Sequence, residues 1–157
     1  MSDLIQVHPT QRLITPGGVE VDIDAEMVPL VQRLWELGLT TKGCCQDFGD
    51  SILNNGHRST SPDDARQRFA DFYSGQAWLK MPTNDAKLLI STLGSHPTFG
   101  PRMRRWTHPE AWMNILYVFP GDKSGADLAD AAQLHFPREQ LPELVEALTW
   151  NWSPPAE

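Results

Sequence analysis

Residues 77–93 read AWLKMPTNDAKLLISTL, and residues 132–148 read AQLHFPREQLPELVEAL. The two segments align at a constant offset of 55 residues, which superimposes Leu79 on Leu134 and the proline of one segment on that of the other. Each segment predicts a short strand, a proline at the strand-to-helix turn and an amphipathic helix, because proline cannot donate to a sheet ladder and so marks a strand end. The repeat favours two pseudo-symmetric βα units, although any strand–proline–helix unit would align about as well.

The chain on either side of the repeat carries further strand and helix patterns. Apolar residues alternate with acidic ones over 19–23, which is typical of a half-buried strand. Apolar residues at helical spacing fill 25–37, and Gly38 follows where a left-handed residue commonly ends a helix. The other predicted elements are short strands at 39–45 and 113–119, a helix at 61–73, and loops at 46–60, 94–111 and 120–130.

This order of strands and helices places the chain in the α+β class. We expect a mixed sheet of four or five strands with helices mainly on one face, arranged as a ferredoxin-like βα-repeat core with an inserted helix. Residues 1–18 end in a proline–glycine–glycine turn and predict an irregular N-terminal segment. A single α+β domain is expected over 19–152, and residues 153–157 are expected to fray.

Composition and charge limit the classes of protein to which this chain can belong. Of its 157 residues, 40% are hydrophobic and 21% are charged, as in a folded globular domain. The sequence shows neither an apolar run long enough to cross a bilayer nor a secretory signal, so a cytoplasmic protein without membrane contact is expected. The net charge of -7 argues against non-specific DNA binding but leaves room for local basic patches.

The adjacent residues Cys44 and Cys45 form the first candidate site. A disulfide between neighbours on a strand would be strained, so both are expected to be reduced thiols. Cys45 stands where a strand runs into a loop that carries Asp47 and His57, and a nearby histidine can lower the pKa of a thiol nucleophile. In the alternative interpretation, one cysteine is a small buried hydrophobic residue and the other is merely exposed.

The same segment offers a second hypothesis, a metal site formed by Cys44, Cys45 and His57 with Asp47 or Asp50. Zinc sites usually show spaced pairs of cysteines and histidines, and this sequence lacks that spacing. The phosphate-binding loop of nucleotide hydrolases and the glycine fingerprint of dinucleotide-binding folds are absent as well. We therefore predict no metal site and no cofactor.

The segment 96–112, HPTFGPRMRRWTHPEAW, is a local basic and aromatic cluster within an acidic protein. Arginine and aromatic side chains together suit contact with phosphates, exposed bases or a protein surface. In the alternative interpretation, the tryptophans pack on the sheet and the arginines pair with surface acids. The residues predicted to bind a partner are Arg102, Arg104, Arg105, Trp106 and His108.

Residues 30–46, LVQRLWELGLTTKGCCQ, combine a helix, a glycine hinge, a threonine and a C-C-Q tip. This segment resembles a pattern in small uncharacterised actinobacterial and actinophage proteins, and the matching residues are Leu34, Trp35, Gly38, Thr41, Cys45 and Gln46. The resemblance is confined to this short segment. It implies a bacterial or phage origin and brings no activity and no catalytic residue with it.

These patterns predict a small non-catalytic binding or regulatory protein that contacts a protein or nucleic-acid partner through the basic-aromatic loop 96–112. The prediction rests on that loop and on the lack of a recognisable catalytic constellation in the sequence. The rival prediction is a small cysteine-dependent enzyme with Cys45 as nucleophile and His57 as base. The identity of the partner and the oligomeric state are left open by the sequence.

Overall fold

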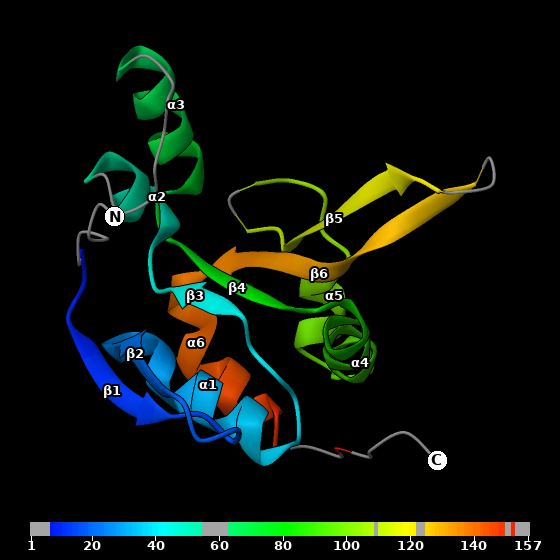
Figure 1. The fold of residues 1–157 in the computed structure, drawn as a ribbon. Helices are drawn as coiled ribbons and strands as arrows, with labels where there is room; N and C mark the ends of the chain where they lie inside the picture. Colours follow the sequence, from blue (N-terminus) through cyan, green and yellow to red (C-terminus); the bar gives the residue numbers. More distant parts are fainter. Residues whose placement is uncertain (1–6, 55–62, 109, 122–124, 150–151, 153–157) are drawn as a thin grey trace.

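An antiparallel four-stranded sheet is the frame of the fold. The structure, a computed structural model, describes residues 7–54, 63–108, 110–121, 125–149 and 152 (Figure 1). Its strands are β1 (Thr10–Ile14), β2 (Glu20–Asp24), β3 (Gly43–Cys45), β4 (Gln76–Pro82), β5 (Met113–Pro120) and β6 (Ala126–Pro137). The four-stranded sheet has the order β3–β4–β6–β5, and a separate two-stranded sheet pairs β1 with β2. The predicted α+β class is confirmed.

The strands of the two predicted βα units are the central neighbours β4 and β6. They pair antiparallel, with Leu79 opposite Leu134 and Met81 opposite Ala132. Leu79 and Leu134, which the sequence repeat superimposes, are therefore also direct partners in the ladder. An antiparallel pair with this register has an approximate local twofold axis through that residue pair, so the repeat in the sequence corresponds to a symmetry of the sheet.

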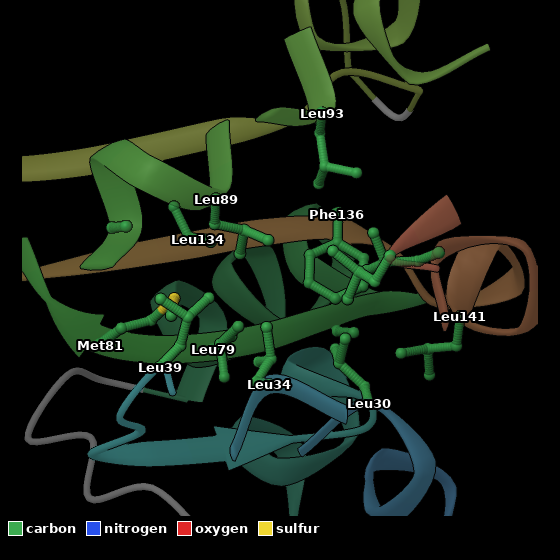
Figure 2. Close-up of a cluster of buried hydrophobic side chains, with 14 of the residues drawn as sticks. Leu30, Leu34, Leu39, Leu79, Met81, Leu89, Leu93, Leu134, Phe136 and Leu141 are labelled. Carbon is green, nitrogen blue, oxygen red and sulfur yellow. The ribbon is translucent and has the colours of Figure 1, made fainter. Parts of the chain in front are cut away.

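Helices α1 (Val28–Glu36), α4 (Thr83–Gly94) and α6 (Leu141–Ala147) lie on one side of this sheet (Figure 1). Short 3-10 turns, η1 (Ala25–Met27) and η2 (Arg138–Gln140), lead into α1 and α6. Gly38, with φ of 82°, follows the end of α1 as predicted. The apolar side chains of the helices and of the central strands form one buried cluster, whose burial is the main favourable contribution to folding (Figure 2). It includes Leu30, Leu34, Leu79, Met81, Leu89, Leu93, Leu134, Phe136 and Leu141.

The opposite face of the sheet is contacted by α2 (Phe48–Leu53) and α3 (Asp63–Tyr73). The rings of Phe48 and Tyr73 have centroids 5.1 and 4.7 Å from that of His135. His135 alternates along β6 with the core residues Leu134 and Phe136, and alternate side chains of a strand point to opposite faces. The remaining helix, α5 (Phe99–Met103), lies against α4.

Two details of the predicted architecture differ from the structure. Neighbouring strands of both described sheets run antiparallel throughout, so the predicted mixed sheet does not form. Strands β4 and β5 run in the same direction, but β6 lies between them and is antiparallel to both. Helices contact both faces rather than mainly one, because α2 and α3 pack on the face opposite to the core. The ferredoxin-like arrangement is not confirmed.

The N-terminal segment is more regular than predicted. Within 1–18, which we expected to be irregular, Thr10–Ile14 form β1 and pair with β2 across a turn that contains Gly18, at φ of 85°. Only Leu13 of β1 is buried, so the strand lacks the alternation by which sequence reasoning finds strands. The regular structure thus begins before residue 19. Residues 1–6 and the tail 153–157 lie outside the described residues.

Three predicted loops also contain regular structure, namely α2 in 46–60, α5 in 94–111 and the first residues of β6 in 120–130. Helix α2 begins after Asp47, whose carboxylate accepts from the backbone nitrogen of Asp50 at 3.1 Å and caps the helix. The predicted strand 39–45 is shorter in the structure and consists of β3. No helix in the described part of the chain has the length and apolar character that crossing a membrane requires.

Gly49 provides a test of the close packing between α2 and α3. A Cβ atom at this position would lie 2.5 Å from the backbone oxygen of Ala70 and 2.6 Å from the backbone nitrogen of Ser74. These backbone atoms can move only if a helix moves, so Gly49→Ala should lower the free energy of unfolding by about 1–3 kcal/mol in urea denaturation.

The matched control is Gly94→Ala, because a Cβ at Gly94 meets no atom within 4 Å. This change should leave the free energy of unfolding unchanged or raise it by up to about 1 kcal/mol, since alanine favours helix more than glycine does. Equal effects of the two substitutions would contradict the close approach of α2 and α3.

Candidate functional site

The predicted partner loop 96–112 is divided between the core and the surface. Phe99 and Trp112, near its two ends, are buried. Trp112 stacks on Phe136 with ring centroids 4.6 Å apart, and its indole nitrogen donates to Gln140 Oε1 at 2.8 Å. Both ends of the loop are therefore anchored in the core, and Arg104, Arg105 and Trp106 between them are exposed at the surface.

The arginines of this loop already have partners within the chain. Arg102 forms an ion pair with Glu143 at 2.9 Å, and Arg105 forms one with Glu110. Arg104 donates to a backbone carbonyl of α4 at 3.4 Å. The interpretation in which the arginines pair with surface acids thus describes Arg102 and Arg105, and contact with a phosphate would have to compete with those pairs.

Trp106 and His108 are placed differently from the arginines. Trp106 is 97% exposed, although an indole usually buries a large apolar area. His108 stacks on Phe72 of α3, with ring centroids 4.3 Å apart and an angle of 10° between the planes. The stack attaches the loop to α3. Trp106, two residues earlier in the sequence, is left in contact with solvent.

A larger aromatic surface surrounds this stack. Phe69 and Phe72 on α3 are exposed, and a shallow cavity of about 350 Å³ lies along them. Burial raises the pKa of Tyr73 at the end of α3, and the charge of Tyr117 of β5 adds to this effect. Together, Phe69, Phe72, Tyr73, Trp106, His108 and Tyr117 form what we call the aromatic face.

The β5–β6 hairpin extends this apolar surface. It projects away from the helices, and β5 forms an outer edge of the sheet (Figure 1). Its side chains Tyr117, Val118, Phe119 and Leu128 are all exposed. An edge strand has unpaired backbone groups, and an exposed apolar edge is typical of a surface that another chain covers.

The Cys45 tip has partners that differ from the predicted ones. His57, the predicted base, lies outside the described residues. His8 is found beside the thiol instead, with its Nδ1 atom 3.8 Å from Cys45 Sγ and 3.1 Å from Asp24 Oδ2. The chain brings residues 8, 24 and 45 together because the β1–β2 hairpin packs against β3.

Asp47, which the sequence also placed at this site, has a structural role. Its carboxylate accepts from the backbone nitrogens of Asp50 at 3.1 Å and Gly75 at 3.2 Å, and it forms an ion pair with Arg138 at 3.4 Å. The Cys45 thiol donates to the backbone carbonyl of Asp47 at 3.2 Å. This residue therefore links β3, α2, the end of α3 and η2.

Of the metal ligands considered from the sequence that lie within the described residues, only Cys45 belongs to the cluster that the structure forms. One donor atom each of His8, Asp24 and Cys45 lies within 4.8 Å of the others, and among the described residues this is the group of histidine, cysteine and acidic side chains that could hold a metal ion. A cavity of about 680 Å³ opens beside the cluster and is also lined by Cys44 and Trp78.

The thiols have the properties of buried groups rather than of nucleophiles. Burial raises the pKa of Cys44 and of Cys45 to about 12, and the Asp24 carboxylate adds to the effect. Cys45 is also only 4% exposed. Because a cysteine nucleophile needs access and a lowered pKa, these observations favour a buried thiol. The enzyme hypothesis with His57 as base stays a prediction.

Sequence reasoning missed several residues of these surfaces. Asp24 stands before a predicted helix and has the appearance of a helix cap, while His8 lies in the segment predicted to be irregular. Phe69 and Phe72 have helical spacing, which usually marks a buried face. The one available signal was Trp106, a tryptophan among charged neighbours in a loop, and it was included in the predicted binding residues.

The reactivity of the cysteines tests the enzyme hypothesis. Since the thiolate is the reactive form, a pKa of about 12 should make both residues roughly 1000-fold slower toward iodoacetamide at pH 8 than a free cysteine. Mass spectrometry of the folded chain measures the rates, and the same chain unfolded in guanidinium chloride is the control. Rapid alkylation of Cys45 in the folded chain would support a nucleophile.

Comparison with known proteins identified no relative of this chain. No protein-family model, no curated protein and no solved structure matches the chain. The assignment of function therefore depends on the geometry of the aromatic face and of the His8–Asp24–Cys45 cluster.

Proposed function

We propose that this chain is a non-catalytic binding protein whose aromatic face docks on a protein partner. The observation that supports this most is Trp106, which is 97% exposed and lies two residues before His108 of the Phe72–His108 stack. Burial of such an indole against a partner is strongly favourable, because a large rigid side chain loses little conformational entropy. Tryptophan is accordingly enriched among the residues that dominate the binding energy of protein interfaces.

A protein partner suits this surface better than a nucleic acid. The ion pairs of Arg102 with Glu143 and of Arg105 with Glu110 already engage two of the loop's cations. The chain has a net charge of -7, which opposes the approach of a polyanion. Val118 and Phe119, the exposed residues of the hairpin that follow Tyr117, are apolar and offer no charge or hydrogen bond to a phosphate.

The support beneath the aromatic face is well packed. Tyr73 contacts Phe48 and His135, whose ring centroids lie 5.0 and 4.7 Å away. The loop that carries Trp106 is anchored by buried Phe99 and Trp112. A surface on an ordered frame loses less conformational entropy on binding. Most of the free energy gained by burying the exposed aromatic side chains is therefore available for affinity.

We also propose a ferredoxin-like core for the fold and a bacterial or phage cytoplasm as the setting of the protein. The chain order β4–α4–α5–β5–β6–α6, with strands in the order β4–β6–β5, supports a ferredoxin-like core in which α5 is an inserted helix and β3 takes the place of the last strand. Cys44 and Cys45 are free thiols, which supports a reducing cytoplasm, and the C-C-Q segment supports a bacterial or phage origin.

A photo-crosslinker in place of Trp106 tests this function. The chain with p-benzoylphenylalanine at that position is illuminated in an extract of its source cells, and crosslinked products are identified by mass spectrometry. We expect one protein to crosslink at position 106. The purified partner should then bind Trp106→Ala at least about 30-fold more weakly than the unmodified chain, as for a residue that dominates an interface.

The control is a crosslinker at Ile14, which is exposed on the β1–β2 hairpin away from the aromatic face. Trp106→Ala should leave Tm almost unchanged because its side chain touches little of the fold. Crosslinks of equal yield from both positions would contradict the proposed surface. Crosslinks mainly to nucleic acid or to a second copy of the chain would contradict the proposed partner.

A further inference from the structure

The geometry points to a zinc site that joins the β1–β2 hairpin to the main sheet, with His8 Nδ1, Asp24 Oδ2 and Cys45 Sγ as its ligands. These atoms come from three segments that are far apart in the sequence and meet only in the folded chain. The site is separate from the aromatic face, so the inference does not depend on the proposed partner binding.

The distances between the donor atoms fit a single ion. Zinc–nitrogen and zinc–oxygen bonds of about 2.0 Å and a zinc–sulfur bond of about 2.3 Å, in tetrahedral geometry, place the ligand atoms roughly 3.3 to 3.6 Å apart. His8 Nδ1 lies 3.1 Å from Asp24 Oδ2 and 3.8 Å from Cys45 Sγ. Both distances to His8 Nδ1 thus differ from the ideal values by only a few tenths of an ångström, and the third distance, between the donor atoms of Asp24 and Cys45, is within 4.8 Å.

The chemistry of the donors favours zinc over the hard cations. Magnesium and calcium prefer shells made only of oxygen atoms, whereas zinc accepts imidazole nitrogen, thiolate sulfur and carboxylate oxygen together. Zinc also needs no more than three protein ligands when a fourth position stays open. The cavity of about 680 Å³ beside the three residues gives that position room for a water molecule or a small ligand.

The surroundings hold the ligands in the orientation that coordination requires. The Asp50 carboxylate lies 3.6 Å from His8 Nε2, on the side of the ring away from Cys45. A carboxylate only accepts, so Asp24 Oδ2 at 3.1 Å favours the imidazole proton on Nδ1 in the metal-free chain. When an ion takes the Nδ1 lone pair, the proton moves to Nε2, which the Asp50 side chain is near enough to approach as the outer partner that is common for metal-bound histidine. The backbone nitrogen of Gln46 donates to Asp24 Oδ2 at 2.9 Å, which fixes the second ligand.

Binding of zinc releases one proton from the chain. The Cys45 thiol loses its proton to solvent and its sulfur forms the bond to zinc, while any proton on His8 Nδ1 moves to Nε2. The dipositive ion then faces one thiolate, one carboxylate and one neutral imidazole. No oxidant or reductant takes part. The ion offsets the repulsion between the Asp24 carboxylate and the Cys45 thiolate, which otherwise disfavours the charged sulfur.

Cobalt binding tests the site, because Co²⁺ adopts zinc-like tetrahedral coordination and a cobalt–thiolate bond absorbs in the near ultraviolet. The full chain, purified with a chelator and dialysed, is titrated with Co²⁺ and then with Zn²⁺. We expect one equivalent to bind, the thiolate band to saturate, and Zn²⁺ to displace it. Cys45→Ser should abolish the thiolate band. The matched control is Cys44→Ser, which should retain the band although Cys44 lines the same cavity.

Affinity and stability give independent readouts. Asp50→Asn removes an outer partner of a ligand and should weaken Zn²⁺ binding by roughly 10- to 100-fold. His8→Gln removes a ligand itself and should weaken Zn²⁺ binding by more than that. For the unmodified chain, Zn²⁺ at 100 times its Kd should raise Tm by about 5 to 10 °C, a result that needs no variant to fold. Absence of saturable binding, or loss of the band in Cys44→Ser but not in Cys45→Ser, would overturn the site.

Discussion

The pairing of β4 with β6 is the constraint on which the other elements depend. Leu79 and Leu134 are direct partners in this ladder, and both lie in the buried cluster that receives α1, α4 and α6. Each strand is followed by its own helix, so one twofold-related pair of βα units positions most of the core. The outer strands β3 and β5 are added to this pair from either side, and each carries one of the candidate surfaces.

Asp47 connects the two surfaces to the frame. Its carbonyl accepts from the thiol of Cys45, while its carboxylate caps α2 and binds the backbone nitrogen of Gly75, just after α3. Arg138 completes the link to η2 and also binds Glu26, whose carboxyl pKa this guanidinium lowers. The position of the metal-binding cluster and the position of α3, which carries much of the aromatic face, are therefore set by the same residue.

Local patterns in the sequence were sufficient for the central part of the fold. The repeat at 77–93 and 132–148 identified the two βα units because proline and apolar spacing are local signals. Strand β1 was missed because its apolar and polar residues do not alternate, and the strand forms by pairing with β2. Helix α2 was missed because its capping residue, Asp47, lies in a segment rich in turn-forming residues. The His8–Asp24–Cys45 cluster could not be predicted, since no spacing rule relates residues that meet only through tertiary packing.

Hydrogen–deuterium exchange, followed peptide by peptide, tests most directly whether the β4–β6 pair is the frame of the molecule. Amides protected only by global unfolding exchange slowest, whereas those that open locally exchange faster. The amides of 76–82 and 131–137 should therefore exchange more slowly than those of 10–24 and of the β5 edge strand at 113–120. Exchange of the central strands as fast as that of the β1–β2 hairpin would contradict this role for the Leu79–Leu134 ladder.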